Sequence, residues 1–173
     1  MRPDLISIAL VSEDGCEFYA ERTDYRRADC SDFVRATVLP LLGSMPDVEC
    51  DRAQLSNRLR EWFDQLPEPA IVIYDFESDW LLFADASLGS DCRQSPAKLG
   101  ENLHLDSAAI THPAFEQALN LNYTQDGPPH HALSDARALW RVTVLGTNSW
   151  KEISGSINSM TSRSNVKASI EKY

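Results

Sequence analysis

The apolar run at residues 70–74 (AIVIY) constrains the fold of this chain more than any other segment. It is continuous and rich in β-branched side chains, which is typical of a strand buried on both faces. Such a strand needs covering elements on either side of its sheet. The preceding segment 51–66 is expected to supply one of them, as a helix with Asp51 at its N-cap. Its apolar residues fall on one stripe at helical spacing, namely Leu55, Leu59, Trp62, Phe63 and Leu66.

Strands and helices alternate along the rest of the chain, as the spacing of apolar residues indicates. Asp14-Gly15 is a strong turn signal, so the segments on either side of it are expected to pair as a hairpin. Pro40 limits a short helix that Ser31 or Asp32 would cap. The predicted strands are residues 4–11, 16–20 and 70–74, the predicted helices are residues 31–38, 51–66, 79–88, 113–121 and 132–144, and residues 89–112 are expected to be irregular. This order predicts an α/β fold with a sheet of mixed strand directions.

The composition divides the chain into a domain and a tail. Its 173 residues are enough for one domain, expected at residues 1–146. Residues 147–173 hold seven serines and little apolar periodicity. Four basic residues against two acidic ones give this segment a charge of +2, so the rest of the chain carries −12. We expect a poorly ordered tail, and the alternative is a basic tail that reaches for RNA.

Composition and charge exclude several classes of protein. The chain has no run of about 18 apolar residues and its N-terminal residues lack the apolar stretch of a signal peptide, so we expect a cytoplasmic protein that does not span a membrane. A net charge of −10 argues against a broad nucleic-acid-binding face, but metal ions can still bridge a short contact with a few 3′-terminal nucleotides. The cysteines are too widely spaced for a zinc motif or a disulfide framework and are expected to be unlinked: Cys16, Cys30, Cys50 and Cys92.

Two polar segments carry the residues that could perform chemistry. Residues 130–137 (HHALSDAR) place His130 five positions before Asp135 at the start of a predicted helix. Residues 74–80 (YDFESDW) follow the buried strand and place Asp79 at the start of another. Such carboxylates can hold a divalent cation, and an imidazole one turn away can take a proton from a metal-bound water. Each residue alone also fits a helix-terminal charge or a loop histidine, so the prediction depends on the combination.

Together the two segments resemble the second and third sequence motifs of the DEDDh group of 3′–5′ exonucleases. Within that group the chain is similar to the ribonuclease T-like branch that includes the mycobacterial-type polyadenylate-directed exoribonucleases. The hairpin at residues 5–20, residues 38–40, residues 75–83 and residues 130–137 carry the resemblance. It extends from residue 4 to about residue 140.

The resemblance implies a fold, an activity and a set of site residues. The fold would be a ribonuclease-H-like mixed sheet flanked by helices, and the activity would be metal-dependent removal of nucleotides from the 3′ end of single-stranded RNA. His130 would be the general base, and Asp79 and Asp135 would hold Mg²⁺ or Mn²⁺. His131, one step out of register, would have a capping or surface role. The resemblance assigns no substrate-binding residue and leaves a homodimer open.

The chain departs from the family pattern at the first motif. In the family, a strand that lies centrally in the sheet carries Asp-x-Glu and supplies two of the four metal-binding carboxylates. No such pair precedes residues 5–11, so we expect the first strand to be missing and the activity to be weak or absent. One alternative is a catalytically inactive ribonuclease-H-like module that binds RNA ends or a protein partner. The other is an unrelated small α/β protein in which residues 130–137 only begin a helix.

Overall fold

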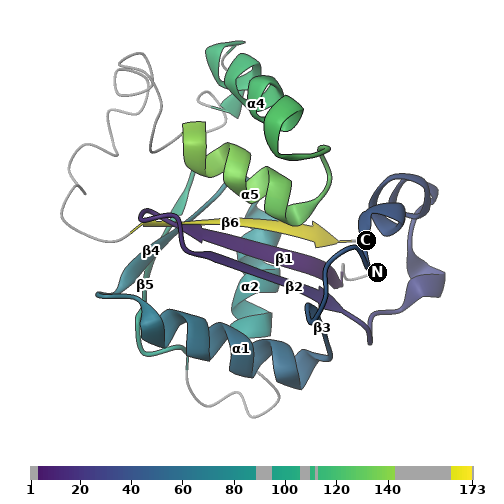
Figure 1. The fold of residues 1–173 in the computed structure, drawn as a ribbon. Helices are drawn as coiled ribbons and strands as arrows, with labels where there is room; N and C mark the ends of the chain where they lie inside the picture. The colour runs from purple at the N-terminus through teal and green to yellow at the C-terminus, as the bar shows by residue number, and fades with distance from the viewer. Residues whose placement is uncertain (1–3, 89–94, 106–109, 112, 143–164, 173) are drawn as a thin grey trace.

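Within the described residues, six strands form one mixed sheet with helices on both faces (Figure 1). The computed structural model describes residues 4–88, 95–105, 110–111, 113–142 and 165–172. The strands are β1 (Leu5–Ser12), β2 (Glu17–Arg22), β3 (Glu49–Cys50), β4 (Ala70–Tyr74), β5 (Leu99–His104) and β6 (Asn165–Lys172). They are arranged in the order β3-β2-β1-β6-β4-β5. β1 is antiparallel to β2 and β6, whereas β4 is parallel to β5 and β6, so the predicted α/β class with a mixed sheet is confirmed.

Helices cover both faces of this sheet (Figure 1). α1 (Arg52–Gln65) and α2 (Glu77–Leu88) pack on one face, and α4 (Pro113–Asp126) and α5 (Ala132–Trp140) pack on the other. Beside α5, a π-helical turn η2 (Val34–Val38) and a 3-10 turn η3 (Leu39–Leu41) pack against β1. No helix among the described residues combines the length and the apolar character that a membrane crossing requires.

Side-chain alternation along β1 explains the two-sided core. Ile8 and Leu10 face α1 and α2, whereas Ala9 and Val11 face α5. Every residue of β1 and of β4 is buried, as a strand between two helical layers requires. The prediction that residues 70–74 form a strand buried on both faces is therefore confirmed.

Local turn and capping signals also form as predicted. Gly15 adopts a φ of +84° in the β1–β2 turn, a value that L side chains rarely reach. The Asp51 carboxylate accepts a hydrogen bond from the Gln54 amide at 2.8 Å, and the Gln54 side chain accepts one from the Asp51 amide at 2.9 Å. These two bonds complete a capping box at the start of α1. The Ser31 hydroxyl accepts from the Val34 amide at 3.2 Å, so the predicted cap is present although the turn after it is π-helical.

The cysteines within the described residues are free thiols, as predicted. Cys16 is exposed, and Cys30 and Cys50 are buried. Burial raises the pKa of the Cys50 thiol, which keeps it protonated and unreactive. Cys92 lies outside the described residues.

Three strands lie outside the sequence predictions. β3 is only two residues long, and β5 falls in the segment that is expected to be irregular. β6 falls in the segment that is expected to be a poorly ordered tail, whose residues 147–164 are not among the described ones. Because β6 pairs with β1 on one side and with β4 on the other, it fills the gap expected at the centre of the sheet.

Candidate functional site

α2 and α5 begin at the same end of the sheet, on opposite faces. α2 follows β4 closely, so it starts at the carboxyl end of that strand. β6 is parallel to β4 and antiparallel to β1, so the amino end of β1 lies at this end too. α5 starts near Glu21, which pairs with Ser7 in the amino half of β1. Asp79 and Asp135, in the first turns of α2 and α5, therefore belong to one end of the sheet.

Asp79 is buried, with 4% of its surface exposed. It precedes Phe83 by four residues and Ala86 by seven, so it shares the stripe of α2 that faces the sheet. A carboxylate in this position loses solvation and needs compensating contacts, which Asp79 does have. The sequence predicts only that Asp79 begins a helix, and the structure shows in addition that its side chain is buried.

A group of polar side chains, which we call the histidine cluster, lies between α5 and the sheet. Tyr19 and Glu21 are two residues apart on β2, so both project from the face that α5 covers. Ser7 pairs with Glu21 across the strands, and its buried hydroxyl has no hydrogen-bond partner within the described residues. The helix contributes the remaining two members, His131 and Asp135.

Glu21 anchors this cluster. Only 3% of its surface is exposed, and both carboxylate oxygens accept hydrogen bonds. The Tyr19 hydroxyl donates to Oε1 at 2.7 Å, and the Gly43 amide donates to Oε2 at 2.8 Å. These donors compensate for the lost solvation of the carboxylate and tie the chain after η3 to β2.

His131 lies against this anchor, half-buried. Its ring centroid is 5.0 Å from that of Tyr19, and its Nδ1 is buried without a hydrogen-bond partner within the described residues. Burial lowers the pKa of His131, while the charges of Glu21 and Asp135 act in the opposite direction. His131 occupies the N-cap position of α5 but makes no side-chain capping bond. The predicted capping or surface role of His131 is therefore wrong, because the turn before α5 directs its ring inward.

His130 has the opposite environment. Its side chain is exposed, and its backbone has a φ of +66°, a left-handed conformation. Its ring meets the exposed Phe33 edge to face, with the centroids 5.2 Å apart. The left-handed residue turns the chain between the loop and α5, so the two adjacent histidines point in different directions.

The metal-binding prediction concerns Asp79 and Asp135. Within the described residues, no three or more histidine, cysteine, aspartate or glutamate side chains are grouped so that they could hold a metal ion. Magnesium, however, is often bound by only one or two carboxylates, with water and substrate phosphates completing its shell. Asp79 and Asp135 are residues of that type, on helices that cover opposite faces of the sheet.

The structure adds Tyr19 and Glu21 to the residues that the sequence singles out, and it places His131 against them. The alternation of Tyr19 and Glu21 along β2 is visible in the sequence, but it does not show which face a helix covers. Contact between β2 and α5 arises only when the sheet and its covering helices assemble.

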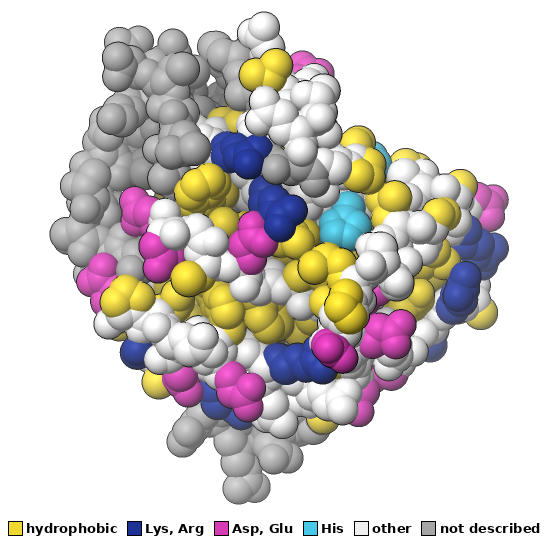
Figure 2. All heavy atoms as spheres, viewed as in Figure 1, with side chains coloured by type: hydrophobic (Ala, Val, Ile, Leu, Met, Phe, Trp, Pro, Cys, Tyr) yellow, Lys and Arg dark blue, Asp and Glu magenta, His cyan; other side chains and the backbone are white. Residues whose placement is uncertain are grey.

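The surface charge agrees with the composition. On the face shown in Figure 2, acidic and basic side chains of the described residues are interspersed. No known family model matches the chain, and a search of curated proteins finds no match.

Proposed function

We propose that this chain is a metal-dependent 3′–5′ exoribonuclease of low activity, acting where α2 and α5 begin. One observation carries the proposal: Asp79 and Asp135, far apart in sequence, start two helices at the same end of the sheet. His130 is exposed on the loop immediately before α5. The DEDDh resemblance calls for these three residues at one site.

The sheet supports a ribonuclease-H-like fold as part of this proposal. The resemblance requires a central strand, and β6 lies between β1 and β4. The sequence of β6, NVKASIEK, has no Asp-x-Glu. The central place is thus filled by a strand that lacks the first-motif pair of carboxylates, which is the reason to expect low activity.

Asp79 and Asp135 would hold one Mg²⁺ or Mn²⁺ ion, with water and substrate phosphate as the other ligands. When bound, the ion supplies electrostatic stabilisation of the negative charge that develops on the phosphate oxygens. The two carboxylates would hold that ion at the end of the sheet where α2 and α5 begin, and His130 lies on the loop that leads into α5.

His130 would act as the general base. Its imidazole is exposed to solvent, whereas the ring of His131 is packed against Tyr19. The water oxygen attacks the terminal phosphorus while His130 accepts its proton, and the bond to the 3′ oxygen of the penultimate nucleotide breaks. That oxygen takes a proton from solvent, and a nucleoside 5′-monophosphate leaves.

The test is stepwise shortening of a 5′-labelled single-stranded RNA from its 3′ end, with Mg²⁺ and with EDTA. We expect slow, Mg²⁺-dependent shortening of an RNA with a free 3′ hydroxyl and none of an RNA with a blocked 3′ end. His130→Ala should lower kcat by roughly 10²–10⁴-fold and leave KM within a few-fold, because the base acts in the chemical step. Asp135→Asn should abolish the Mg²⁺-dependent release of mononucleotides, because it removes a proposed ligand of the ion.

His131→Ala is the matched comparison for His130→Ala. It should lower stability because it removes a half-buried ring, so both variants are compared well below their unfolding temperatures. If His131→Ala alone loses turnover, the base is His131 and the assignment of His130 is wrong. If Asp135→Asn retains full Mg²⁺-dependent release, the proposed site is wrong.

A catalytically inactive module that binds RNA ends or a protein partner is the second candidate. The absence of Asp-x-Glu from β6 favours it. RNA binding that is unchanged by EDTA, together with no release of mononucleotides at high enzyme concentration, would establish this alternative in place of the nuclease.

A further inference from the structure

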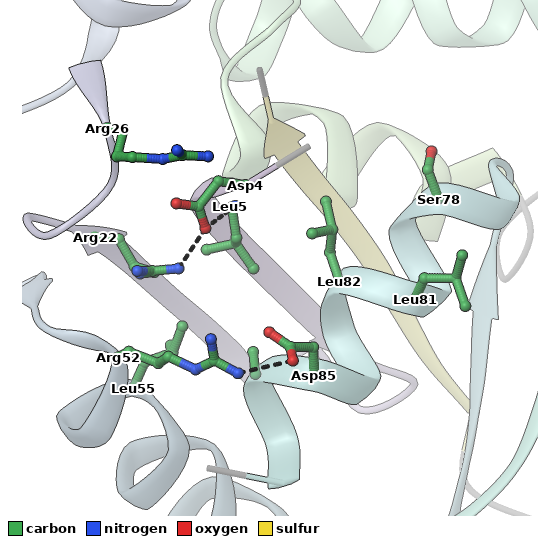
Figure 3. Close-up of a pocket in the computed structure, with 11 residues that line it drawn as sticks. Asp4, Leu5, Arg22, Arg26, Arg52, Leu55, Ser78, Leu81, Leu82 and Asp85 are labelled. Carbon is green, nitrogen blue, oxygen red and sulfur yellow. Dashed lines mark hydrogen bonds and ion pairs between the residues drawn. The ribbon is translucent and has the colours of Figure 1, made fainter. Parts of the chain in front are cut away.

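A cavity of about 630 Å³ opens between α1, α2 and the start of β1 (Figure 3). This volume lies within the range of small-molecule binding sites. Ser78, the neighbour of Asp79 in the first turn of α2, lines the cavity, so it borders the end of the sheet described above. The cavity is separate from the histidine cluster, which lies on the opposite face.

Three arginines line this cavity: Arg22, Arg26 and Arg52. Only two acidic residues, Asp4 and Asp85, accompany them in the lining. Each of the three is paired with an aspartate: Arg22 with Asp4 and Asp24, Arg26 with Asp29, and Arg52 with Asp85. Guanidinium groups bind phosphate through paired N–H donors, so a group of arginines around a cavity favours a phosphate-bearing ligand.

Arg22 is the structural member of this set. Its side chain is 7% exposed, and it pairs with Asp4 and Asp24, at 2.8 Å in both cases. These contacts satisfy the buried guanidinium and fix Asp4 at the rim. Arg22 therefore shapes the cavity. Arg26 and Arg52 are more exposed and each holds an ion pair, Arg26 with Asp29 at 3.2 Å and Arg52 with Asp85, so these two are the groups that a ligand can reach.

Arg52 is held by an exposed ion pair that a ligand can replace. Its Nη2 lies 2.7 Å from Oδ1 of Asp85, which joins α1 to α2 across the cavity (Figure 3). The two side chains are 42% and 57% exposed, so water and salt weaken their attraction. A phosphate carries more negative charge than one carboxylate and can accept two guanidinium N–H groups at once.

The α2 side of the cavity is apolar. Leu81 and Leu82 of α2 lie across from Arg22 and Arg26 (Figure 3). Of the buried leucines, Leu5 lies between the arginines and α2, and Leu55 lies beside Arg52 (Figure 3). A ligand with both a phosphate and a flat apolar part would meet the arginines at one end and leucines at the other. A nucleotide has this combination, whereas inorganic phosphate would use only the charged end.

We propose that this cavity binds one nucleotide unit, with its phosphate on Arg52 and Arg26 and its base against the leucine wall, and that the phosphate displaces Asp85 from Arg52. The choice of a nucleotide rests on the proposed function, since an exoribonuclease both holds RNA nucleotides and releases nucleoside monophosphates. The same phosphate can belong to an RNA strand or to a free nucleotide.

The experiment is titration calorimetry in EDTA, so that binding is measured without turnover. The probes are AMP, adenosine, inorganic phosphate and a short single-stranded oligoadenylate, each added to the full chain and to three variants. AMP should bind more tightly than adenosine or phosphate. Arg52→Gln should weaken AMP binding by roughly tenfold or more, because it removes charge-assisted hydrogen bonds. Asp85→Asn should strengthen it, because Arg52 no longer has a competing carboxylate.

Arg60→Gln is the matched control, since Arg60 lies on the same helix and is not among the residues that line the cavity. It should leave AMP binding unchanged. Binding of both AMP and the oligonucleotide through Arg52 indicates an RNA strand, and binding of AMP alone indicates a free nucleotide. Equal affinity for adenosine and AMP, or no effect of Arg52→Gln, would overturn the proposal. Loss of nuclease activity with retained binding would count against the proposed function only.

Discussion

At the residue scale, the position of His131 has a consequence for stability that can be measured. Burial lowers the pKa of its imidazole below the usual value of 6.5. Well above that value the group is neutral in the folded and unfolded chains and contributes nothing to the pH dependence. As the pH falls below it, the unfolded chain binds a proton that the folded chain resists, so the free energy of unfolding decreases.

We therefore expect urea midpoints to fall between about pH 7.5 and pH 5.5, and the fall to be smaller in His131→Asn. His130→Asn is the control, because it removes an exposed neighbouring imidazole. The carboxylates whose pKa is lowered, Asp14 and Asp24, lose their contributions only in more acidic solution, since their usual value is 3.8. An unchanged pH dependence in His131→Asn would contradict the expected effect of burial.

The same two histidines show how far spacing alone predicts a site. The interval between His130 and Asp135 is local, so the sequence correctly places both at the start of one helix. The orientation of each ring depends on the positive φ of His130 and on Tyr19 beneath the helix. Both are consequences of the assembled fold, and no pattern within residues 130–137 encodes them.

At the element scale, the start of α1 offers a direct test of local encoding. Asp51→Ala removes the side-chain half of the capping box and should lower the free energy of unfolding by about 1 kcal/mol. Urea denaturation measures this loss. Asp64→Ala, an exposed substitution in the last turn of the same helix, is the control and should change stability by less than about 0.5 kcal/mol. Equal effects of the two changes would mean that lost charge, and not the cap, is responsible.

Elements differ in how strongly their own residues specify them. α1 combines a cap with an apolar stripe, and β4 is apolar throughout, so both are predicted at the correct place. β5 (LGENLH) is a largely exposed edge strand with few apolar residues. Its composition does not favour a strand, so β5 forms because it pairs with β4. β6 lies in a serine-rich segment, so its composition does not predict a strand either. The side chain of Val166, the one described in this strand, is fully buried.

At the scale of the whole molecule, β6 determines whether the sheet is continuous. It lies between β1 and β4, and no pairing between those two strands is present within the described residues. Without β6, each of them would present an unpaired edge in the middle of the molecule, which favours aggregation. The centre of the sheet therefore depends on contacts between residues near the two ends of the sequence, and local patterns cannot reveal them.

This arrangement leads to a prediction about activity. If an Asp-x-Glu strand is added before residue 4, it should compete with β6 for the place between β1 and β4, because both would use the same backbone groups. We expect the added strand to increase Mg²⁺-dependent release of mononucleotides, and to do so more strongly when residues 165–173 are removed. Removal of those residues without the added strand should abolish cooperative thermal unfolding.

A strand with Asn-x-Gln in place of Asp-x-Glu is the matched control, since it should restore folding but not turnover. Full activity of the unmodified chain would show that other carboxylates serve the site, and equal activity of the added strand with and without β6 would show that the two strands do not share one place.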